Sequence, residues 1–315
     1  MIGSRLLSTA TLLAVAATAP NFARCDSFGA GVDAFSIDFV TVGSPGNAPD
    51  LTGFPSAVGA VDHQYRIGVY EVSEQMIDAA NALGGLGISH DGRGPDKPAT
   101  SVSWLEAAKF ANWLNTSTGN APAYKFDGGG DLQFWAPGDA GYNSDNPLRN
   151  AESLYFLPTV DEWYKAAYYD PNAVAYWDYP SGSNTDPIPV TSGTDAGTAV
   201  FSQSEITGPA AIMQAGGLSP LGTMAQGGNV TEWQETPYGG FSDPIGARFG
   251  RGGNWDTTQT ALASTDGATA SPTVESRTLG FRVASRIPEP AAAAQCLLLV
   301  FSAAWYLATR RHASV

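Results

Sequence analysis

The chain is 315 residues long, and 30 acidic against 16 basic side chains give it a formal net charge of −14. This balance disfavours a nucleic-acid partner, because phosphate binding depends on basic side chains. The two cysteines, Cys25 and Cys296, lie near the two ends of the chain. No disulfide can therefore stabilise the central region, whose stability must come from burial of its apolar and aromatic side chains.

Residues 1–24 have the pattern of a secretory signal peptide. Arg5 precedes an apolar run over residues 6–19, which is the order of the charged and apolar regions of such a signal. The run is shorter than the roughly 20 apolar residues of a membrane span. Two sets of small residues offer a cleavage point, so the cut stays open. We expect an exported chain whose folded domain begins at about residue 26.

Three helices are expected in the region that follows. One begins after Ser73, with Met76 among its apolar positions. The others begin at Ser103 and Thr159, because each is followed three residues later by Glu, the capping-box pattern that satisfies the first free amides of a helix. These two helices are expected to end near residues 114 and 168.

Strands are expected over residues 64–71 and 279–284, which are short and rich in β-formers. Residues 181–198 show no periodicity and are expected to form a loop. No repeat or second domain separates from the rest. The sequence therefore predicts one α+β domain over residues 26–286, with few helices and long loops.

Few side chains suit transition-metal or nucleophilic chemistry. His63 and His90 are the only histidines before the C-terminal tail, and neither has the spacing of a zinc site. A Ser-His-Asp triad through either histidine is left open. Loop acids at 127–131 and 139–145 could bind Ca²⁺, but they lack the EF-hand spacing, and solvated carboxylates are the simpler interpretation.

The last 29 residues, 287–315, form a separate segment. Pro288, Glu289 and Pro290 precede an apolar stretch over 291–309, and Arg310 and Arg311 follow it. At 1.5 Å per residue the stretch is roughly 28 Å long, close to the hydrocarbon thickness of a bilayer. The sequence predicts a C-terminal transmembrane helix, with the arginines in the cytoplasm and the domain on the other side.

This tail resembles the PEP-CTERM sorting signal, which Gram-negative bacteria use to hand exported proteins to an exosortase. The resemblance implies an exosortase as a partner and transient anchoring in the inner membrane. It also implies processing near Pro288, Glu289 and Pro290, and a destination at the cell surface or in an extracellular matrix.

Six short motifs in the central region resemble, in order, the signatures of the formylglycine-generating enzyme, or sulfatase-modifying factor, family. They lie at residues 65–73, 98–104, 157–167, 228–233, 251–255 and 280–282. The resemblance implies an irregular, loop-rich α+β fold related to the C-type lectin fold and held partly by Ca²⁺.

Catalytic members of that family oxidise a sulfatase cysteine to formylglycine, using copper held by two thiolates just upstream of the Gly-Phe-Arg motif. Thiolates are the ligands that Cu(I) needs. Residues 256–279, the corresponding stretch here, contain no cysteine, and Thr231 stands where an active-site Trp is usual. We therefore expect neither copper nor formylglycine-generating activity.

The resemblance also implies a calcium site near the Gly-Asn-Val motif. Main-chain oxygens of Gly228 and Val230 and the side chain of Glu232 would be ligands, whereas Ala225 stands where a further oxygen ligand would fall. The alternative for Glu232 is a buried acid paired with an arginine such as Arg251. The other motif residues are expected first of all to build the core and fix loops: Asn229, Trp233, Arg251, Gly252, Gly253, Trp255, Gly280, Phe281 and Arg282.

Two functions are weighed. The favoured one is a non-catalytic module that binds an extracellular polysaccharide or protein through loops on a lectin-like scaffold. The alternative is an enzyme of the same fold that works through carboxylates such as Asp256 or Asp266 with a hard metal. Converging acids with perturbed pKa values would favour the enzyme, and exposed aromatic side chains would favour binding. A purely structural matrix protein is the remaining option.

Overall fold

The computed structural model describes residues 24–288. The expected signal peptide, apart from Arg24, and the expected anchor, with Glu289, Pro290, Arg310 and Arg311, lie outside the described residues. Within residues 24–288, no helix is both long and apolar enough to cross a membrane.

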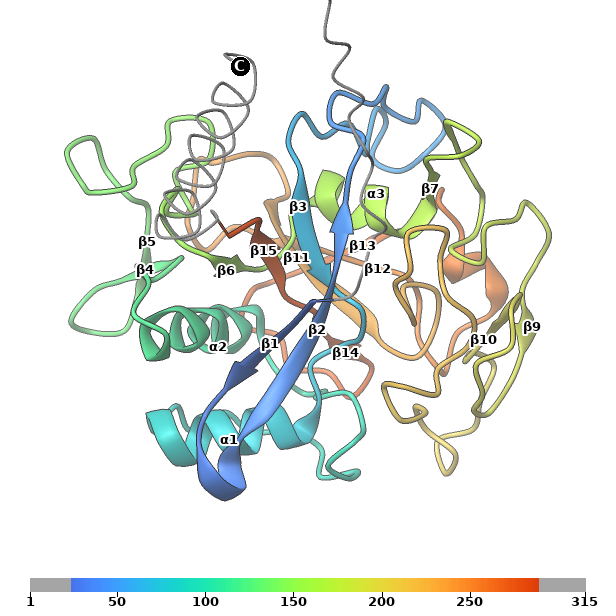
Figure 1. The fold of residues 1–315 in the computed structure, drawn as a ribbon, viewed down its shortest axis with the longest axis horizontal. Helices are drawn as coiled ribbons and strands as arrows, with labels where there is room; N and C mark the ends of the chain where they lie inside the picture. The colour runs from blue at the N-terminus through green and yellow to red at the C-terminus, as the bar shows by residue number, and fades with distance from the viewer. Residues whose placement is uncertain (1–23, 289–315) are drawn as a thin grey trace, which may run out of the picture.

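One antiparallel and one mixed sheet organise the domain (Figure 1). The five-stranded sheet has the order β1 (Arg24–Phe28), β2 (Phe35–Val42), β3 (Tyr65–Gly68), β15 (Ala284–Arg286) and β6 (Tyr155–Phe156). The four-stranded sheet has the order β13 (Ala268–Ala270), β12 (Arg248–Arg251), β11 (Thr231–Pro237) and β14 (Leu279–Gly280). Small ribbons pair β4 (Lys125–Phe126) with β5 (Leu132–Gln133), β7 (Tyr169–Asp170) with β8 (Ala175–Tyr176), and β9 (Ile188–Pro189) with β10 (Thr198–Ala199).

The three expected helices are present as α1 (Glu74–Gly84), α2 (Trp104–Ser117) and α3 (Val160–Tyr168). Ser73, Ser103 and Thr159 are their N-caps, and both predicted capping boxes form. Two short 3-10 helices, Gly31–Asp33 and Gln259–Leu262, complete the helices of residues 24–288. The helix starts were predictable because each depends on side chains that bond amides only two or three residues away.

The expected strand over residues 279–284 was wrong in one respect: it is two strands in two sheets. β14 pairs with β11, and β15 pairs with β3 and β6, so the chain crosses from one sheet to the other between Gly280 and Ala284. Arg282 lies on this crossing, between the sheets, and its position there decides its partners.

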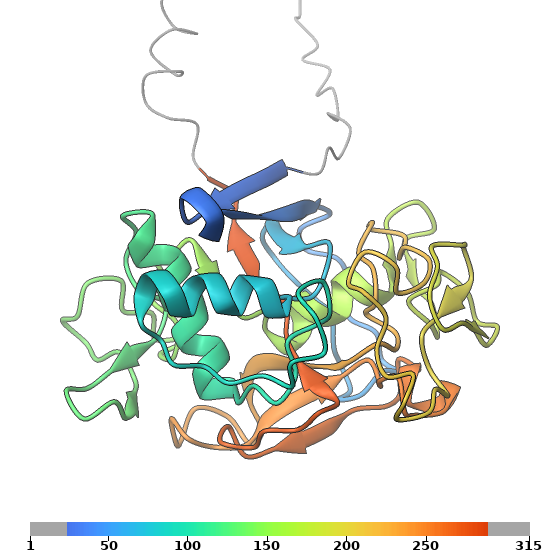
Figure 2. The ribbon, with the colours of Figure 1, turned by 90° about the horizontal axis from the view of Figure 1, so that it is seen from below.

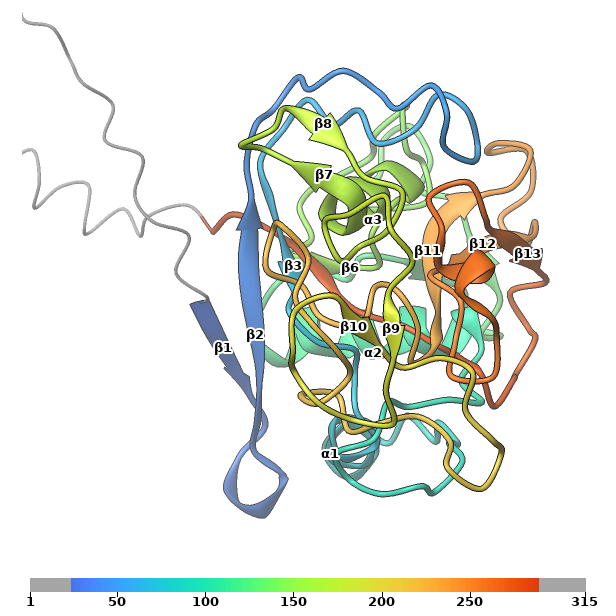
Figure 3. The ribbon, with the colours of Figure 1, turned by 90° about the vertical axis from the view of Figure 1, so that its right-hand side faces the viewer.

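The two sheets lie at opposite sides of the domain, with α1 and α2 between them (Figures 2 and 3). The main core fills this space and includes fully buried side chains from the helices and from both sheets, among them Phe39, Trp104, Phe110, Trp233 and Phe281. β1 and β15, which carry the two ends of the described chain, both belong to the five-stranded sheet. Both ends therefore leave the domain on the side opposite β12 and β13 (Figure 2). The α+β class and the loop-rich outline predicted from the sequence are confirmed.

Candidate functional site

Glu232 and Arg282 form a buried ion pair that joins the two sheets. Neither side chain is exposed to solvent. Nε and Nη2 of Arg282 donate to the two carboxylate oxygens of Glu232, each at 2.6 Å. The remaining donors of Arg282 reach main-chain carbonyls of Gly68, Val69 and Met224. The arginine thereby ties β11 to the end of β3 and to the loop at Met224 through five hydrogen bonds.

The carboxylate of Glu232 is fully committed, because Nε1 of Trp163 also donates to it at 2.7 Å. A guanidinium on both oxygens does not fit a calcium ligand, since calcium needs free carboxylate or carbonyl oxygens. Of the two interpretations of Glu232, the structure shows the paired acid, but its partner is Arg282 and not Arg251. Calcium at Gly228, Val230 and Glu232 stays a prediction that metal analysis would test.

Arg251 faces Glu232 in the register of β11 and β12, yet its side chain turns elsewhere. Its guanidinium carbon lies 4.9 Å from the ring centre of Tyr164, and Nη2 donates to the carbonyl of Ser264. Stacking on an aromatic face suits the planar guanidinium, so Arg251 is held without a carboxylate.

The motifs at 228–233 and 251–255 interlock. The amide of Gly228 donates to the Gly252 carbonyl, and the amide of Trp255 donates to the Asn229 carbonyl. Nδ2 of Asn229 donates to Glu71, and burial raises the pKa of Glu71 well above its usual range. Gly228 has a φ of +93°, and a Cβ there would clash with the main chain of Val200. Of the motif side chains in the core, Trp233, Trp255 and Phe281 have no exposed surface.

A pocket of about 230 Å³ opens on the four-stranded sheet. Two parts of the chain meet in this pocket: position 231 and the stretch before the Gly-Phe-Arg motif. These are the two places where the family resemblance implies copper chemistry. Its lining is apolar or hydroxylated throughout: Thr231, Gly250, Ala268, Thr269, Ala270, Val274, Ser276, Thr278 and Leu279.

The donor set of this pocket does not fit copper. Among residues 24–288 the single cysteine is Cys25, which is exposed on β1 in the other sheet. In the same range, no three His, Cys, Asp or Glu side chains come close enough to hold a metal ion. Asp256 and Asp266, the acids considered for a changed chemistry, are exposed and do not line the pocket.

Residues 35–287 match the sulfatase-modifying factor enzyme 1-like domain, FGE-sulfatase. The chain belongs to this family. The match covers the described residues almost from end to end and includes all six motifs.

Solved structures share the fold of this sulfatase-modifying factor domain. The Treponema denticola variable protein 1 is 19% identical, covers 84% of this chain and 99% of its own, and superposes with a TM-score of 0.59. CarF is 22% identical, covers 80% and 99%, and has a TM-score of 0.55. PvdO from Pseudomonas aeruginosa is 17% identical, covers 83% and 98%, and has a TM-score of 0.52. Among curated proteins, none matches the chain significantly.

The sulfatase-modifying factor domain also carries a larger cleft, of about 410 Å³, which the sequence analysis did not foresee. It lies beside β3, β6, the start of α3 and the end of β15, and shares no residue with the pocket on β11–β14. Its lining is mostly polar: His63, Gln64, Tyr65, Asn143, Arg149, Asn150, Ala151, Ser153, Phe156, Glu162, Arg286 and Ile287.

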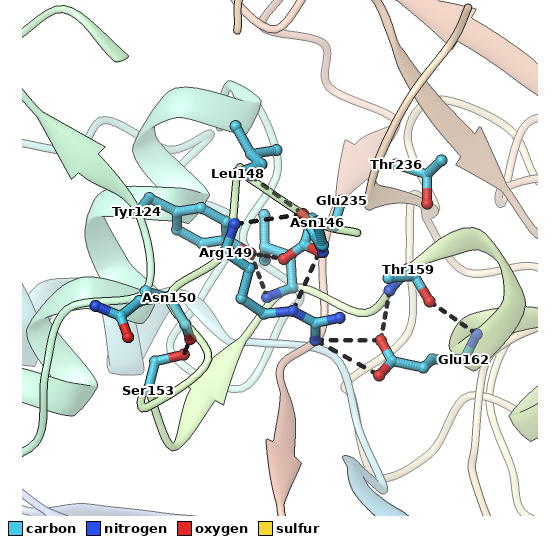
Figure 4. Close-up of polar contacts among 12 residues, drawn as sticks. Tyr124, Asn146, Leu148, Arg149, Asn150, Ser153, Thr159, Glu162, Glu235 and Thr236 are labelled. Atoms are coloured by element: carbon cyan, nitrogen blue, oxygen red, sulfur yellow. Dashed lines mark hydrogen bonds and ion pairs between the residues drawn. The ribbon is translucent and has the colours of Figure 1, made fainter. Parts of the chain in front are cut away.

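Arg149 lines this cleft and lies between two buried acids (Figure 4). Its Nη1 is 3.4 Å from Oε2 of Glu162, and its Nε is 3.2 Å from Oε1 of Glu235. Burial raises the pKa of Glu235, although the charge of Arg149 and hydrogen bonds from Tyr124 and Asn146 oppose this.

Glu162 is the third helical residue of α3 and serves both its capping box and this network. Its Oε2 accepts the amide of Thr159 at 2.8 Å, and its Oε1 accepts Nε2 of His63 at 3.0 Å. Burial alone would raise the pKa of Glu162, but Arg149, His63 and the Thr159 amide outweigh it and lower the pKa to about 2. The capping box was the one signal in the sequence that marked this acid.

Both histidines of the described chain have committed ring nitrogens. His63 bonds Asp62 and Glu162, and the hydrogen bond to Glu162 raises the pKa of His63 against the opposing effect of burial. His90 bonds Asp78 through Nε2 and accepts the amide of Gly92 at Nδ1. Neither is placed as the base of a Ser-His-Asp triad, because each contacts carboxylates or main chain in place of a serine hydroxyl.

Proposed function

We propose that this sulfatase-modifying factor domain is a non-catalytic binding module. The observation that supports it is the lining of the pocket on β11–β14, which consists of hydroxyl-bearing, apolar and glycine residues. The family resemblance implies thiolates at this place in the oxidising members. Such a lining has no general acid or base and no soft metal ligand. It can still recognise a ligand by shape and by the hydroxyls of Thr231, Ser276 and Thr278.

The proposed setting of the module is the outside of the cell. The signal pattern at 1–24 and the tail with Pro288, Glu289, Pro290, Arg310 and Arg311 support export, transient anchoring in the inner membrane and processing by an exosortase. A chain anchored through its tail would turn the pocket on β11–β14 away from the membrane, because the described chain ends on the opposite side of the domain (Figure 2). The ligand we propose is an extracellular polysaccharide or protein.

The test uses a substitution that fills the pocket. Thr231 lines it and is only partly buried, so Thr231→Trp would occupy the space where a ligand binds. Thr185→Trp, on an exposed loop outside the pocket, is the matched control. Binding would be measured on glycan and peptide arrays with the purified protein.

We expect one ligand class that the wild-type protein and the Thr185 variant retain and the Thr231 variant loses. Equal binding by all three proteins would contradict a role for this pocket. Conversion of a cysteine-containing sulfatase peptide to formylglycine would contradict the non-catalytic assignment itself.

A further inference from the structure

The cleft around Arg149 brings two arginines together in an acidic chain. The protein carries a formal net charge of −14. Arg149 and Arg286 line the cleft with the acid Glu162, and Glu235 contacts Arg149 from behind the lining. The hydrogen bond to Glu162 raises the pKa of His63, and the exposed carboxylate of Asp62 contacts the same ring. Because the arginines are not fully used by these acids, their guanidinium groups can still bind an anion directly.

The charge of Glu162 is offset by Arg149 in their ion pair, and its oxygens are already occupied. Both oxygens of Glu162 already accept hydrogen bonds, from Thr159, His63 and Arg149. Further acceptors in the lining are also committed: Oδ1 of Asn143 accepts the amide of Asp145, and Oδ1 of Asn150 accepts the amide of Glu152.

Donors, by contrast, remain available. Among residues 24–288, none accepts a hydrogen bond from Nη2 of Arg149 (Figure 4). This nitrogen is also not one of the side-chain polar atoms that are both buried and without a hydrogen-bond partner. Arg286 is exposed and uses only Nη1, which donates to the carbonyl of Ala151. The side-chain amides of Gln64 and Asn143 add N–H groups to the same lining.

The guanidinium of Arg149 is preorganised. Its carbon lies 3.9 Å from the ring centre of Phe156, and Glu162 and Glu235 fix two of its edges. A group held in this way loses little conformational entropy when a ligand binds. The two aromatic residues of the lining, Tyr65 and Phe156, are buried, so the cleft presents polar groups and not an aromatic platform.

We propose that this cleft is a second binding site, separate from the pocket on β11–β14, and that it takes a carboxylate-bearing sugar. The carboxylate lies against Arg149 and Arg286, and the ring hydroxyls are bound by Gln64 and Asn143. A guanidinium fits a carboxylate through paired, charge-assisted hydrogen bonds. The volume of about 410 Å³ lies within the usual range of small-molecule sites.

The experiment is calorimetric titration of the purified full-length chain with galacturonate, with galactose as the neutral sugar and acetate as the carboxylate without a ring. Arg286→Gln removes the rim charge from an exposed side chain, so folding is not at risk. Arg277→Gln, an exposed arginine outside the cleft, is the matched control. Arg149→Lys keeps the positive charge between Glu162 and Glu235 and removes Nη2, the guanidinium nitrogen that has no partner among the described residues.

We expect galacturonate to bind, and galactose and acetate to bind about tenfold more weakly or not at all. Arg286→Gln and Arg149→Lys should each raise the Kd for galacturonate by about tenfold or more, and Arg277→Gln should leave it unchanged. Equal binding of galactose would overturn the role of the carboxylate. Equal binding of acetate would overturn the role of the sugar ring, and no binding of galacturonate would overturn the site.

Discussion

Removing Arg282 should destabilise the protein more than removing any exposed arginine. In Arg282→Met the side chain keeps about the length of the arginine stem, but Glu232 stays in the interior with only the indole of Trp163 as a donor. Breaking a buried ion pair by removing one partner costs about 3–5 kcal/mol, because the other charge is left uncompensated. That is about a fifth or more of the roughly 5–15 kcal/mol by which domains are stable.

The assay is urea unfolding followed by tryptophan fluorescence, together with the melting temperature. For a domain of this size a loss of about 3–5 kcal/mol lowers Tm by roughly 6–20 °C. Arg277→Met is the control, because Arg277 forms an exposed ion pair with Glu205 and such pairs contribute about 0–1 kcal/mol. Adding Glu232→Leu to Arg282→Met should recover part of the loss, because the buried charge is then gone.

The reasoning would be refuted if Arg282→Met unfolded within about 1 kcal/mol of the wild type, as the Arg277 variant is expected to do. The buried pair would then have no measurable part in joining the two sheets. A loss that Glu232→Leu did not reduce would locate the cost in the three main-chain carbonyls and not in the charge.

Further predictions concern the capping box of α2 and the pH dependence of the cleft. Ser103→Ala should cost about 0.5–2 kcal/mol of unfolding free energy, because the hydroxyl accepts the amide of Glu106; an unchanged urea midpoint would be evidence against the cap. His63→Gln should be more destabilising at about pH 6 than at about pH 8.5. A raised pKa in the folded state means that the stabilisation by His63 is fully present below its unfolded pKa and is lost as the pH rises through the folded value. A constant difference across that range would contradict the contact with Glu162.

Local features of the fold were predictable. Ser103 and Thr159 are the N-caps of α2 and α3 because capping depends on side chains within one turn. The alternation of Phe35, Ile37 and Phe39 also marks β2 in the sequence, although no strand was predicted there, and burial follows this alternation over residues 35–39. A closer reading of period-two patterns would have found this strand.

Contacts between distant elements were not predictable in the same way. Sequence spacing allowed Arg251 as a partner of Glu232, and the strand register does place the two opposite each other. The choice of Arg282 depends on the crossing between β14 and β15, which no local pattern reveals. Arg149 was missed for a similar reason: it lies in a loop without a motif, and Glu162 and Glu235 reach it from α3 and β11.

The most direct test of the central claim is incubation of the purified protein with copper, oxygen and a cysteine-containing sulfatase peptide, followed by mass spectrometry of the peptide and metal analysis of the dialysed protein. Because the pocket on β11–β14 has no thiolate, we expect the peptide to be unchanged and the protein to retain no stoichiometric copper. Formylglycine in the peptide, or one copper ion per chain, would contradict a non-catalytic binding module.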